Sequence, residues 1–532
     1  MPLVPLKFKA GIVKDTTEYF AGQSGFYIDG NLVRFKNGFP TKIGGWQENT
    51  YSFTSAQDVA ATVTGTPKHL QAWRSSNDGL DRIVVGTTNH LYVLVGSVFF
   101  DITPLRKTTS NLTNPLAVAD EGTTVTVTDN SHGASNGDFI IINSATTTGG
   151  ITAANFNRLE GYQITVVNAN SYTFTAPTAA TSTVSAGGGT TIDIGYLIGN
   201  AEGLGFQSSD PALGWGVGAW GSFAGGPGWG ESADVASSTV SLDATNWSLA
   251  LWGEDLLINN RGGQLYYWDT SDSSSTTRAE LVSSETGAIG VPTKVREIDP
   301  MLIRFANQED FVVFTPTSTN TAGDQRLEVG TKIISMIPTK DETFIQTDEA
   351  AYGMGFVGPP FTFSFRLLAV NCGAVALHGS ANVDGDVYWI GRSNFFAYDG
   401  TVKELPCSVQ HFVFDRLQIA YIDKTYAAHN KKFNEVTWFY VSTDNSAQTN
   451  NPEPDSYVTF NYQDGSWTIG TLQRNVWHDA GGFRNVPFAF DKDGKLYNHE
   501  TGTSDAGSAM SAFIETGDIQ LDNAGNNLVL ID

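Results

Sequence analysis

The sequence predicts an all-β protein, a β-propeller of about six or seven blades with an Ig-like β-sandwich inserted into it. Three observations lead to this prediction. Gly, Thr, Ser, Asn and Val are frequent and no long helical pattern occurs, which favours strands and turns. Pairs of apolar runs joined by tight turns recur along the chain. A segment of different composition interrupts this recurrence.

The recurring unit is an apolar strand, a polar turn and a second strand that carries an aromatic residue. Examples are DRIVVGTTNHLYVLVG (81–96), EDLLINNRGGQLYYWD (254–269) and DGDVYWIGRSNFFAYDG (384–400). In the last of these, Asp384-Gly385 and Asp399-Gly400 are predicted turns, because Asp and Gly tolerate the backbone that hairpins require. The alternative, that Asp384 and Asp386 form a catalytic or metal-binding pair, loses weight once the stretch is one copy of a repeat.

The spacing of the aromatic residues supports a propeller. The residues that mark successive units are Tyr92, Tyr266, Phe311, Tyr352, Tyr398, Tyr440 and Tyr497. From Tyr266 to Tyr440 the steps are 41 to 46 residues, within the roughly 40–50 residues of a propeller blade. Tyr497 follows after 57 residues, which predicts one longer loop.

The interval from Tyr92 to Tyr266 is too long by about three repeats, and the insertion lies there. Residues 107–196 are rich in Thr, Ala, Asn and Gly and contain alternating strands such as TTVTVTD (123–129) and SYTFTAP (171–177), as expected for a small β-sandwich. The predicted division of the chain is an N-terminal segment with the first blade or blades (1–106), the inserted sandwich (107–196), a Gly/Trp-rich loop (197–235), the remaining blades (236–505) and a C-terminal strand region (506–532). Because the chain stops inside an apolar stretch, NLVLID (527–532), we expect an extension beyond it.

Charge and composition exclude several classes of protein. With 31 Lys and Arg against 55 Asp and Glu, the net charge is −24, which opposes a protein that grips nucleic acid. Two cysteines, Cys372 and Cys407, are too few for a disulfide framework, and the N-terminus has no apolar run of signal-peptide length. The most apolar stretch, 90–100, falls short of the ~20 residues of a membrane helix. We expect a soluble chain that folds in a cytoplasm and has no membrane span.

Motifs that would carry catalysis or metal binding are weak. GVGAWG (216–221) matches a dinucleotide-binding fingerprint but lacks the strand and helix that this fingerprint needs. DKDGKLYNHE (491–500) has its Gly and Glu at the wrong positions for a calcium loop and reads as a hairpin turn. The histidines are scattered, and Cys372 and Cys407 lie in apolar surroundings, typical of packed thiols. We predict no catalytic, cofactor-binding or metal residues and no enzymatic activity, although a propeller can draw catalytic carboxylates from separate blades.

The Gly/Trp-rich segment carries the best candidate for binding. Trp215, Trp220 and Trp229 lie among glycines, and exposed aromatic residues in such a setting often mark a contact surface. The alternative is that this loop packs on its own propeller, and the sequence leaves the two interpretations open.

Several stretches resemble one phage family, the tail nozzle proteins (tail tubular protein B) of short-tailed phages and the related packaged-DNA stabilisation proteins. They are WSLALWGEDLLINNRGGQLYYWD (247–269), GPPFTFSFRLLAVNCGAVA (358–376), DGDVYWIGRSNFFAYDGTVKELPC (384–407), the stretches NEVTWFYVS and YVTFNYQDGSWTIGTLQRNVW within 434–477, and GNLVRFKNGFPTKIGGW (30–46). The likeness covers about half of the chain, and in the family the last of these stretches starts the first blade.

The resemblance implies a structural virion protein, assembled in the host cytoplasm and located in the virion tail. It implies a homo-hexamer below the tail adaptor ring, beside tail fibres or other tail proteins, whose lumen retains packaged DNA and passes it on infection. It brings no catalytic residues to this chain. The acidic charge would let DNA slide without adhering. The alternatives are a glycan-binding or glycan-cleaving tail propeller at the host surface, and the adaptor or DNA-stabilisation plug itself.

Overall fold

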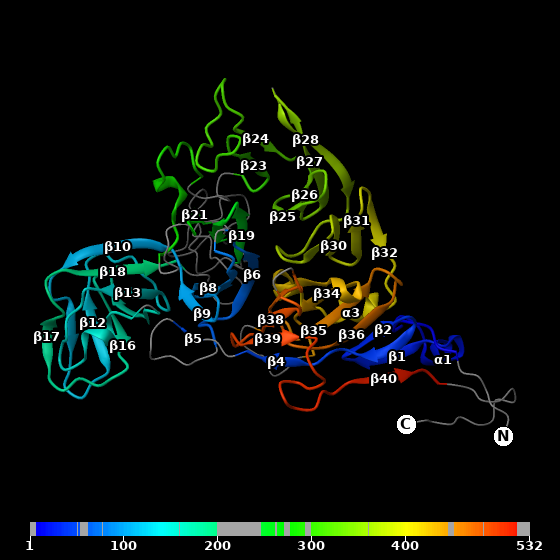
Figure 1. Ribbon diagram of the computed structural model, residues 1–532, viewed down its shortest axis with the longest axis horizontal. Helices are drawn as coiled ribbons and strands as arrows, with labels where there is room; N and C mark the ends of the chain where they lie inside the picture. The colour runs from blue at the N-terminus through cyan, green and yellow to red at the C-terminus, as the bar shows by residue number, and fades with distance from the viewer. Residues whose placement is uncertain are drawn as a thin grey trace, which may run out of the picture.

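The fold is all-β, and its centre is a ring of sheets (Figure 1). The computed structural model describes residues 7–49, 52–53, 62–76, 78–158, 160–198, 246–260, 263–270, 277–292, 299–359, 361–444, 452–481 and 484–518. Within these residues, seven sheets follow one another in chain order around a common centre, and we number them sheet 1 to sheet 7. The predicted fold class, a β-propeller with an inserted sandwich, is confirmed.

Sheet 1 precedes the insertion in the chain, and sheets 2 and 3 follow it. Sheet 1 consists of β6 (Pro67–Arg74), β7 (Asp81–Thr87), β8 (Leu91–Val95) and β9 (Val98–Asp101), with β5 (Ser52–Phe53) parallel to β9 at its edge. Sheet 2 consists of β19 (Trp247–Trp252), β20 (Asp255–Asn260), β21 (Leu265–Trp268) and β22 (Glu280–Leu281), followed by the short helix η2 (Val282–Ser284). Sheet 3 is a hairpin of β23 (Leu302–Phe305) and β24 (Gly323–Arg326).

The other four sheets have four antiparallel strands each. Sheet 4 consists of β25 (Ile333–Pro338), β26 (Thr343–Thr347), β27 (Ala350–Gly358) and β28 (Thr362–Val370), and sheet 5 of β29 (Ser380–Val383), β30 (Asp386–Ile390), β31 (Phe395–Tyr398) and β32 (Val402–Leu405). The helices α3 (Gln410–Arg416) and η3 (Ile419–Lys424) lead to sheet 6, which consists of β33 (Tyr426–Asn430), β34 (Glu435–Tyr440), β35 (Ser456–Asn461) and β36 (Trp467–Thr471), with η4 (Lys431–Phe433) after β33. Sheet 7 consists of β37 (Val476–His478), β38 (Phe488–Phe490), β39 (Leu496–His499) and β4 (Trp46–Glu48).

The ring closes through β4, which comes from the N-terminal part of the chain and completes the last sheet. Tyr497 pairs with Glu48 and His499 pairs with Trp46, so β4 lies antiparallel to β39. On the other side, the inner strand β37 contacts the inner strand β6 of sheet 1. Closure by a strand from the opposite end of the chain leaves short, protected edges, as a propeller requires.

The remaining N-terminal elements form a layer against sheet 6, together with the last described strand. We call this set the terminal layer: α1 (Glu18–Ser24), β1 (Tyr27–Asn31), β2 (Val33–Lys36), β3 (Phe39–Lys42) and β40 (Phe513–Thr516). Strand β1 pairs with β40, and β2 pairs with β3. The stretch 30–46, which the family resemblance places at the start of the first blade, instead leads through this layer into the last sheet.

The inserted sandwich has two antiparallel sheets around its own core. One sheet has the order β10 (Leu105–Leu112), β18 (Ile192–Leu197), β13 (Phe139–Asn143) and β14 (Tyr162–Gln163). The other has the order β15 (Thr165–Asn168), β16 (Ser171–Thr175), β12 (Thr124–Thr128), β11 (Leu116–Val118) and β17 (Val184–Gly187), and the short helix α2 (Ala153–Phe156) lies between β13 and β14 in the chain. The two ends of the insertion meet, because the Ile198 amide donates to the Pro104 carbonyl over 3.0 Å.

Tryptophan side chains tie each of several sheets to the one before it. The indole N–H of Trp247 in sheet 2 donates to the carbonyl of Thr87 in sheet 1 over 2.7 Å, and that of Trp438 in sheet 6 donates to Gly379 at the start of sheet 5 over 3.1 Å. Trp389, Trp467 and Trp477 make the same kind of bond to the carbonyls of Cys372, Pro406 and His429. Such a bond satisfies the one polar group of a buried indole, so the ring can fill the space between two sheets.

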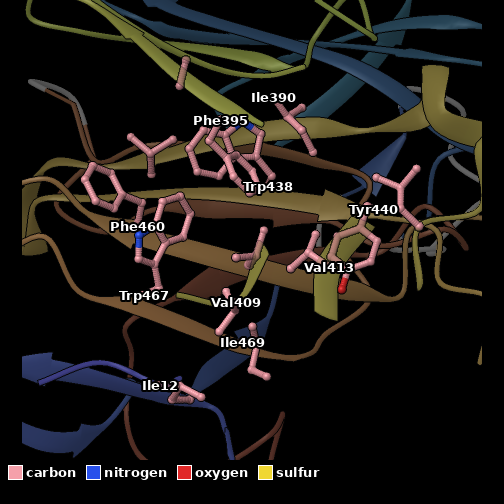
Figure 2. Close-up of a cluster of buried hydrophobic side chains, with 14 of the residues drawn as sticks. Ile12, Ile390, Phe395, Val409, Val413, Trp438, Tyr440, Phe460, Trp467 and Ile469 are labelled. Atoms are coloured by element: carbon pink, nitrogen blue, oxygen red, sulfur yellow. The ribbon is translucent and has the colours of Figure 1, made fainter. Parts of the chain in front are cut away.

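The largest core cluster lies between sheets 5 and 6 (Figure 2). Phe395 packs against Trp438 and against Trp467, with ring centroids 4.8 Å apart in both pairs. Ile12, from the segment before α1, enters the same cluster, and its amide donates to the Trp467 carbonyl over 2.8 Å. Tyr27 and Phe35 of the terminal layer belong to the same cluster, so this packing attaches the layer to the ring.

Buried charges also hold the ends of the chain together. Arg34 in β2 binds Glu435 in β34 through two bonds of 2.9 Å and binds Glu500, just after β39, through bonds of 2.9 and 2.5 Å. All three side chains are buried, and the Arg34 guanidinium also lies over the Phe433 ring. Two carboxylates share one guanidinium here, and burial raises the pKa of Glu435 to about 7 in spite of the opposing effect of Arg34.

Five of the seven aromatic residues of the predicted repeat lie at equivalent positions in their sheets. Tyr92, Tyr266, Tyr352, Tyr398 and Tyr497 all lie in the third strand of their sheets. Tyr440 lies in the second strand of sheet 6, whose third strand, β35, carries Tyr457. Phe311 lies outside the strands, between β23 and β24. The long loop is therefore within sheet 6, between β34 and β35.

We expect replacement of Trp389 to destabilise the protein in two separable steps. Its side chain is fully buried and packs on Phe344 and Phe396. Trp389→Ala removes the ring and should lower the free energy of unfolding by about 3–5 kcal/mol. Trp389→Phe keeps most of the packing, loses the bond to Cys372 and should lower it by about 1–3 kcal/mol. Denaturant midpoints measure both; equal midpoints for Trp389→Ala and wild type would contradict the packing described.

We also expect Glu435 to make stability depend on pH. Because its pKa is raised from 4.5 to about 7 in the folded protein, its contribution is fully present below pH 4.5 and is lost as the pH rises through about 7. Glu435→Gln cannot ionise, so the difference in unfolding free energy between wild type and variant should change by on the order of 1–3 kcal/mol over this range. Denaturant midpoints at several pH values test this, and parallel pH profiles would contradict it.

Candidate functional site

A cavity of about 630 Å³ at the centre of the ring is the candidate binding site. It is lined by the inner strands of six sheets, β6, β19, β23, β25, β29 and β33, and by residues beside them. These strands reach the centre because each is the first strand of its sheet, and the sheets are arranged radially (Figure 1). A ring of radial sheets therefore creates a site from residues far apart in the sequence.

Two histidines close one side of this cavity. The imidazole of His69 in β6 stacks on that of His378, just before β29, with ring centroids 4.0 Å apart and an interplanar angle of 6°. His378 Nε2 lies 2.9 Å from the carbonyl oxygen of Trp247 in β19. Burial, followed by the imidazoles of His378 and His478, lowers the pKa of His69 well below its usual range. His69 is therefore neutral at pH 7, and the two rings can stack without charge repulsion.

This histidine pair also sets the width of the propeller centre. Sheets 1 and 5 approach each other across the propeller at this stack, where the two imidazole rings are in van der Waals contact. The major groove of duplex DNA alone is about 12 Å wide. A duplex therefore cannot pass along the axis of a single propeller.

The rest of the lining is mixed in character. Aliphatic side chains such as Leu249, Ile303 and Ile334 alternate with the polar groups of Gln71 and Ser380.

Asp299 is the one carboxylate among the described lining residues. The Met301 amide and then Arg326 hold its pKa below its usual range, so it is ionised at neutral pH. Most glycosidases use a pair of carboxyl groups roughly 5–9.5 Å apart, and the described lining offers one carboxylate.

The acidic residues considered from the sequence lie in turns or at the ends of strands. Asp384 has a positive φ of 53° and binds Lys431 over 2.6 Å, while Asp386 begins β30. In the stretch 491–500, Asp491 accepts from the Asp493 and Lys495 amides, as in a hairpin turn, and Glu500 is bound to Arg34. No group of three or more His, Cys, Asp or Glu side chains placed to hold a metal ion occurs in the part of the chain that the structure describes.

The predicted contact tryptophans and the two cysteines have different outcomes. Trp215, Trp220 and Trp229 lie outside the described residues. Cys372 is buried and Cys407 is partly buried, and both are free thiols. Burial raises the pKa of the Cys372 thiol to about 11 and that of Cys407 to about 12. Both thiols are therefore protonated at neutral pH, which makes them poor nucleophiles.

Sequence reasoning missed the residues that line the cavity. His69 and His378 are separated by several hundred residues and belong to no motif, so only the placement of β6 and β29 in one ring brings them together. The sole local signal is that each stands at or near the first strand of a repeat unit. Of the described helices, none is long and apolar enough to cross a membrane.

Comparison with known proteins does not assign the chain to a family. No family model matches the chain, and no curated protein matches it. Among solved structures, the chain is similar to the phage phi92 endosialidase, with 10% identity over 93% of this chain and 72% of that chain and a TM-score of 0.20. It is also similar to the N-terminal domain of Nup159 (8% identity, 48% of this chain and 76% of that chain, TM-score 0.26) and to BBS1N in complex with ARL6DN (9% identity, 87% and 98%, TM-score 0.27). Likenesses this weak carry no argument about function.

We expect both thiols to resist alkylation in the folded protein. With the pKa values of Cys372 and Cys407 near 11 and 12, very little thiolate is present at pH 8. Treatment with iodoacetamide followed by mass spectrometry should show slow labelling of the native chain and fast labelling in denaturant. The denatured sample is the control, and rapid labelling of the native protein at either position would contradict the burial described.

Proposed function

We propose that this chain is a structural subunit of a short-tailed phage tail, a nozzle protein that assembles with copies of itself into a six-fold ring. In this proposal the ring lies below the tail adaptor, retains packaged DNA in the particle and lets it pass on infection. The observation that carries the proposal is the resemblance of several stretches to the nozzle family. In this fold those stretches contribute to sheets 2, 4, 5, 6 and 7 and to the terminal layer.

The geometry of the propeller is in keeping with a ring of several copies. The stack of His69 on His378 blocks the centre of a single subunit to a duplex, so DNA passage requires a lumen that several subunits surround. The excess of acidic residues, 55 against 31 basic ones, would repel phosphates and keep the DNA from adhering to that lumen. Turnover has no part in this function.

A six-fold ring in electron micrographs of the purified protein is the expected result, with the same ring found below the adaptor in virions that contain the chain. Class averages and antibody labelling of intact particles measure these two properties. A label at the adaptor position itself would instead indicate the DNA-stabilisation plug.

Two further results would contradict the proposal. One is a monomer or trimer that binds or depolymerises host polysaccharide, the behaviour of a glycan-acting tail propeller. The other is a ring whose lumen is neutral or basic and that retains duplex DNA on a filter at physiological salt, because an acidic lumen should not retain it.

A further inference from the structure

Strand β4 completes sheet 7, and it packs on a buried pair of side chains, Arg474 and His499. The pairing of β4 with β39 brings Trp46 opposite His499 (Figure 1). The centroid of the Trp46 indole lies 5.5 Å from that of the His499 imidazole and 5.2 Å from the guanidinium carbon of Arg474. The large aromatic residue of the closing strand therefore rests on these two side chains.

The bond between Arg474 and His499 exists only while the imidazole is neutral. Arg474 Nε–H donates to His499 Nε2 over 2.8 Å, and both residues are buried, at 5% and 2% exposure. A guanidinium offers donors alone, so Nε2 must accept with its lone pair, and protonation removes that lone pair. Protonation of His499 would also hold two cations together away from water.

The other titratable groups around this pair have partners of their own. They are Glu435 and Glu500, bound to Arg34; Asp505, bound to Trp46; Asp491, bound to Tyr497; and His429, beside Asp479. Burial and then the Arg474 charge therefore decide the behaviour of His499, and they lower its pKa well below the usual range.

We propose that mild acid releases β4 from sheet 7, because protonation of His499 breaks its bond to Arg474 and separates the two side chains beneath Trp46. Since the pKa of His499 in the folded protein lies below its ordinary value of 6.5, the residue stabilises the closed form fully above pH 6.5. This contribution is lost as the pH falls below 6.5. Such a pH response goes beyond the proposed function and does not depend on it.

Mild acid leaves the other buried charges of the ring in place. Two lysines lower the pKa of Glu453 against the effect of burial, so Glu453 keeps its bonds to Lys68 of sheet 1 and to Asn475 at the start of sheet 7. Glu435 acts in the opposite sense to His499, because its raised pKa makes its contribution to stability largest in acid. We therefore expect the ring and the terminal layer to stay folded while β4 opens.

Release of β4 would expose the edge of β39. At neutral pH the short strand Trp46–Glu48 covers this edge and pairs with it. A strand edge with unpaired amides and carbonyls can accept a further strand, so acid would convert a protected edge into an open one.

Hydrogen exchange measured by mass spectrometry tests the release on the whole chain. At each pH the rates are divided by those of an unstructured peptide, so that only protection is compared. One buried imidazole raises the opening equilibrium about tenfold for each pH unit below 6.5, so protection of β4 and β39 should fall about tenfold to thirtyfold between pH 6.5 and about pH 5. Sheet 4, which contains no histidine, is the internal reference and should keep its protection.

His499→Gln is the decisive variant. Its amide oxygen can accept the same bond from Arg474 but takes up no proton in this pH range, so the protection of β4 and β39 should stay constant. His411→Gln is the matched control, because His411 is exposed in α3, and it should lose protection in acid as the wild type does.

Three results would overturn the proposal. They are equal protection of β4 in the wild type at both pH values, a loss of protection as large in sheet 4 as in β4, and a His499→Gln protein that responds to acid like the wild type. The comparison of β4 with sheet 4 needs the wild type alone, so it decides the matter even where His499→Gln fails to fold. Electron micrographs at neutral pH, which test the proposed function, are independent of all three results.

Discussion

Closure of the ring is the constraint on which the rest of the structure depends, and one buried carboxylate lies where the two ends of the ring meet. Glu453, between β34 and β35, accepts bonds from Lys68 of sheet 1 (2.8 Å), from Lys424 beside sheet 6 (2.6 Å) and from Asn475 at the start of sheet 7 (2.7 Å). Burial alone would raise the pKa of Glu453, but the two ammonium groups lower it, so the carboxylate stays ionised. Loss of either lysine would leave the buried charges poorly compensated.

The closing contacts join segments that are far apart in the chain, and this separation explains what the sequence could predict. Strand alternation is a local property, so TTVTVTD and SYTFTAP were correctly predicted as strands and correspond to β12 and β16. The aromatic residues of the predicted repeat mark the third strand of their sheets. This prediction was wrong at Tyr440 and Phe311. There the chain departs from the regular unit, with a long connection inside sheet 6 and a two-stranded sheet 3.

The candidate site could not be predicted in the same way. The stack of His69 on His378 and the bonds of Arg34 to Glu435 depend on which strands become neighbours in space, and neither has a local pattern. The tryptophans that join the sheets were visible in the sequence, yet nothing in it shows that the Trp247 indole reaches a carbonyl of sheet 1. By contrast, the sequence does show that the run 350–372, which includes GPPFTF, is apolar and has no acidic residue. It does not show that part of this run is exposed.

Charge and architecture together divide the tasks within the proposed assembly. The histidine stack blocks the propeller centre to a duplex, so in the proposed assembly the passage lies on the axis of a ring of subunits. An acidic lumen favours sliding of DNA but also drives subunits apart, since like charges within a Debye length of about 8 Å repel even at physiological salt. Subunits of net charge −24 can therefore assemble only through surfaces that lack acids or match them with bases.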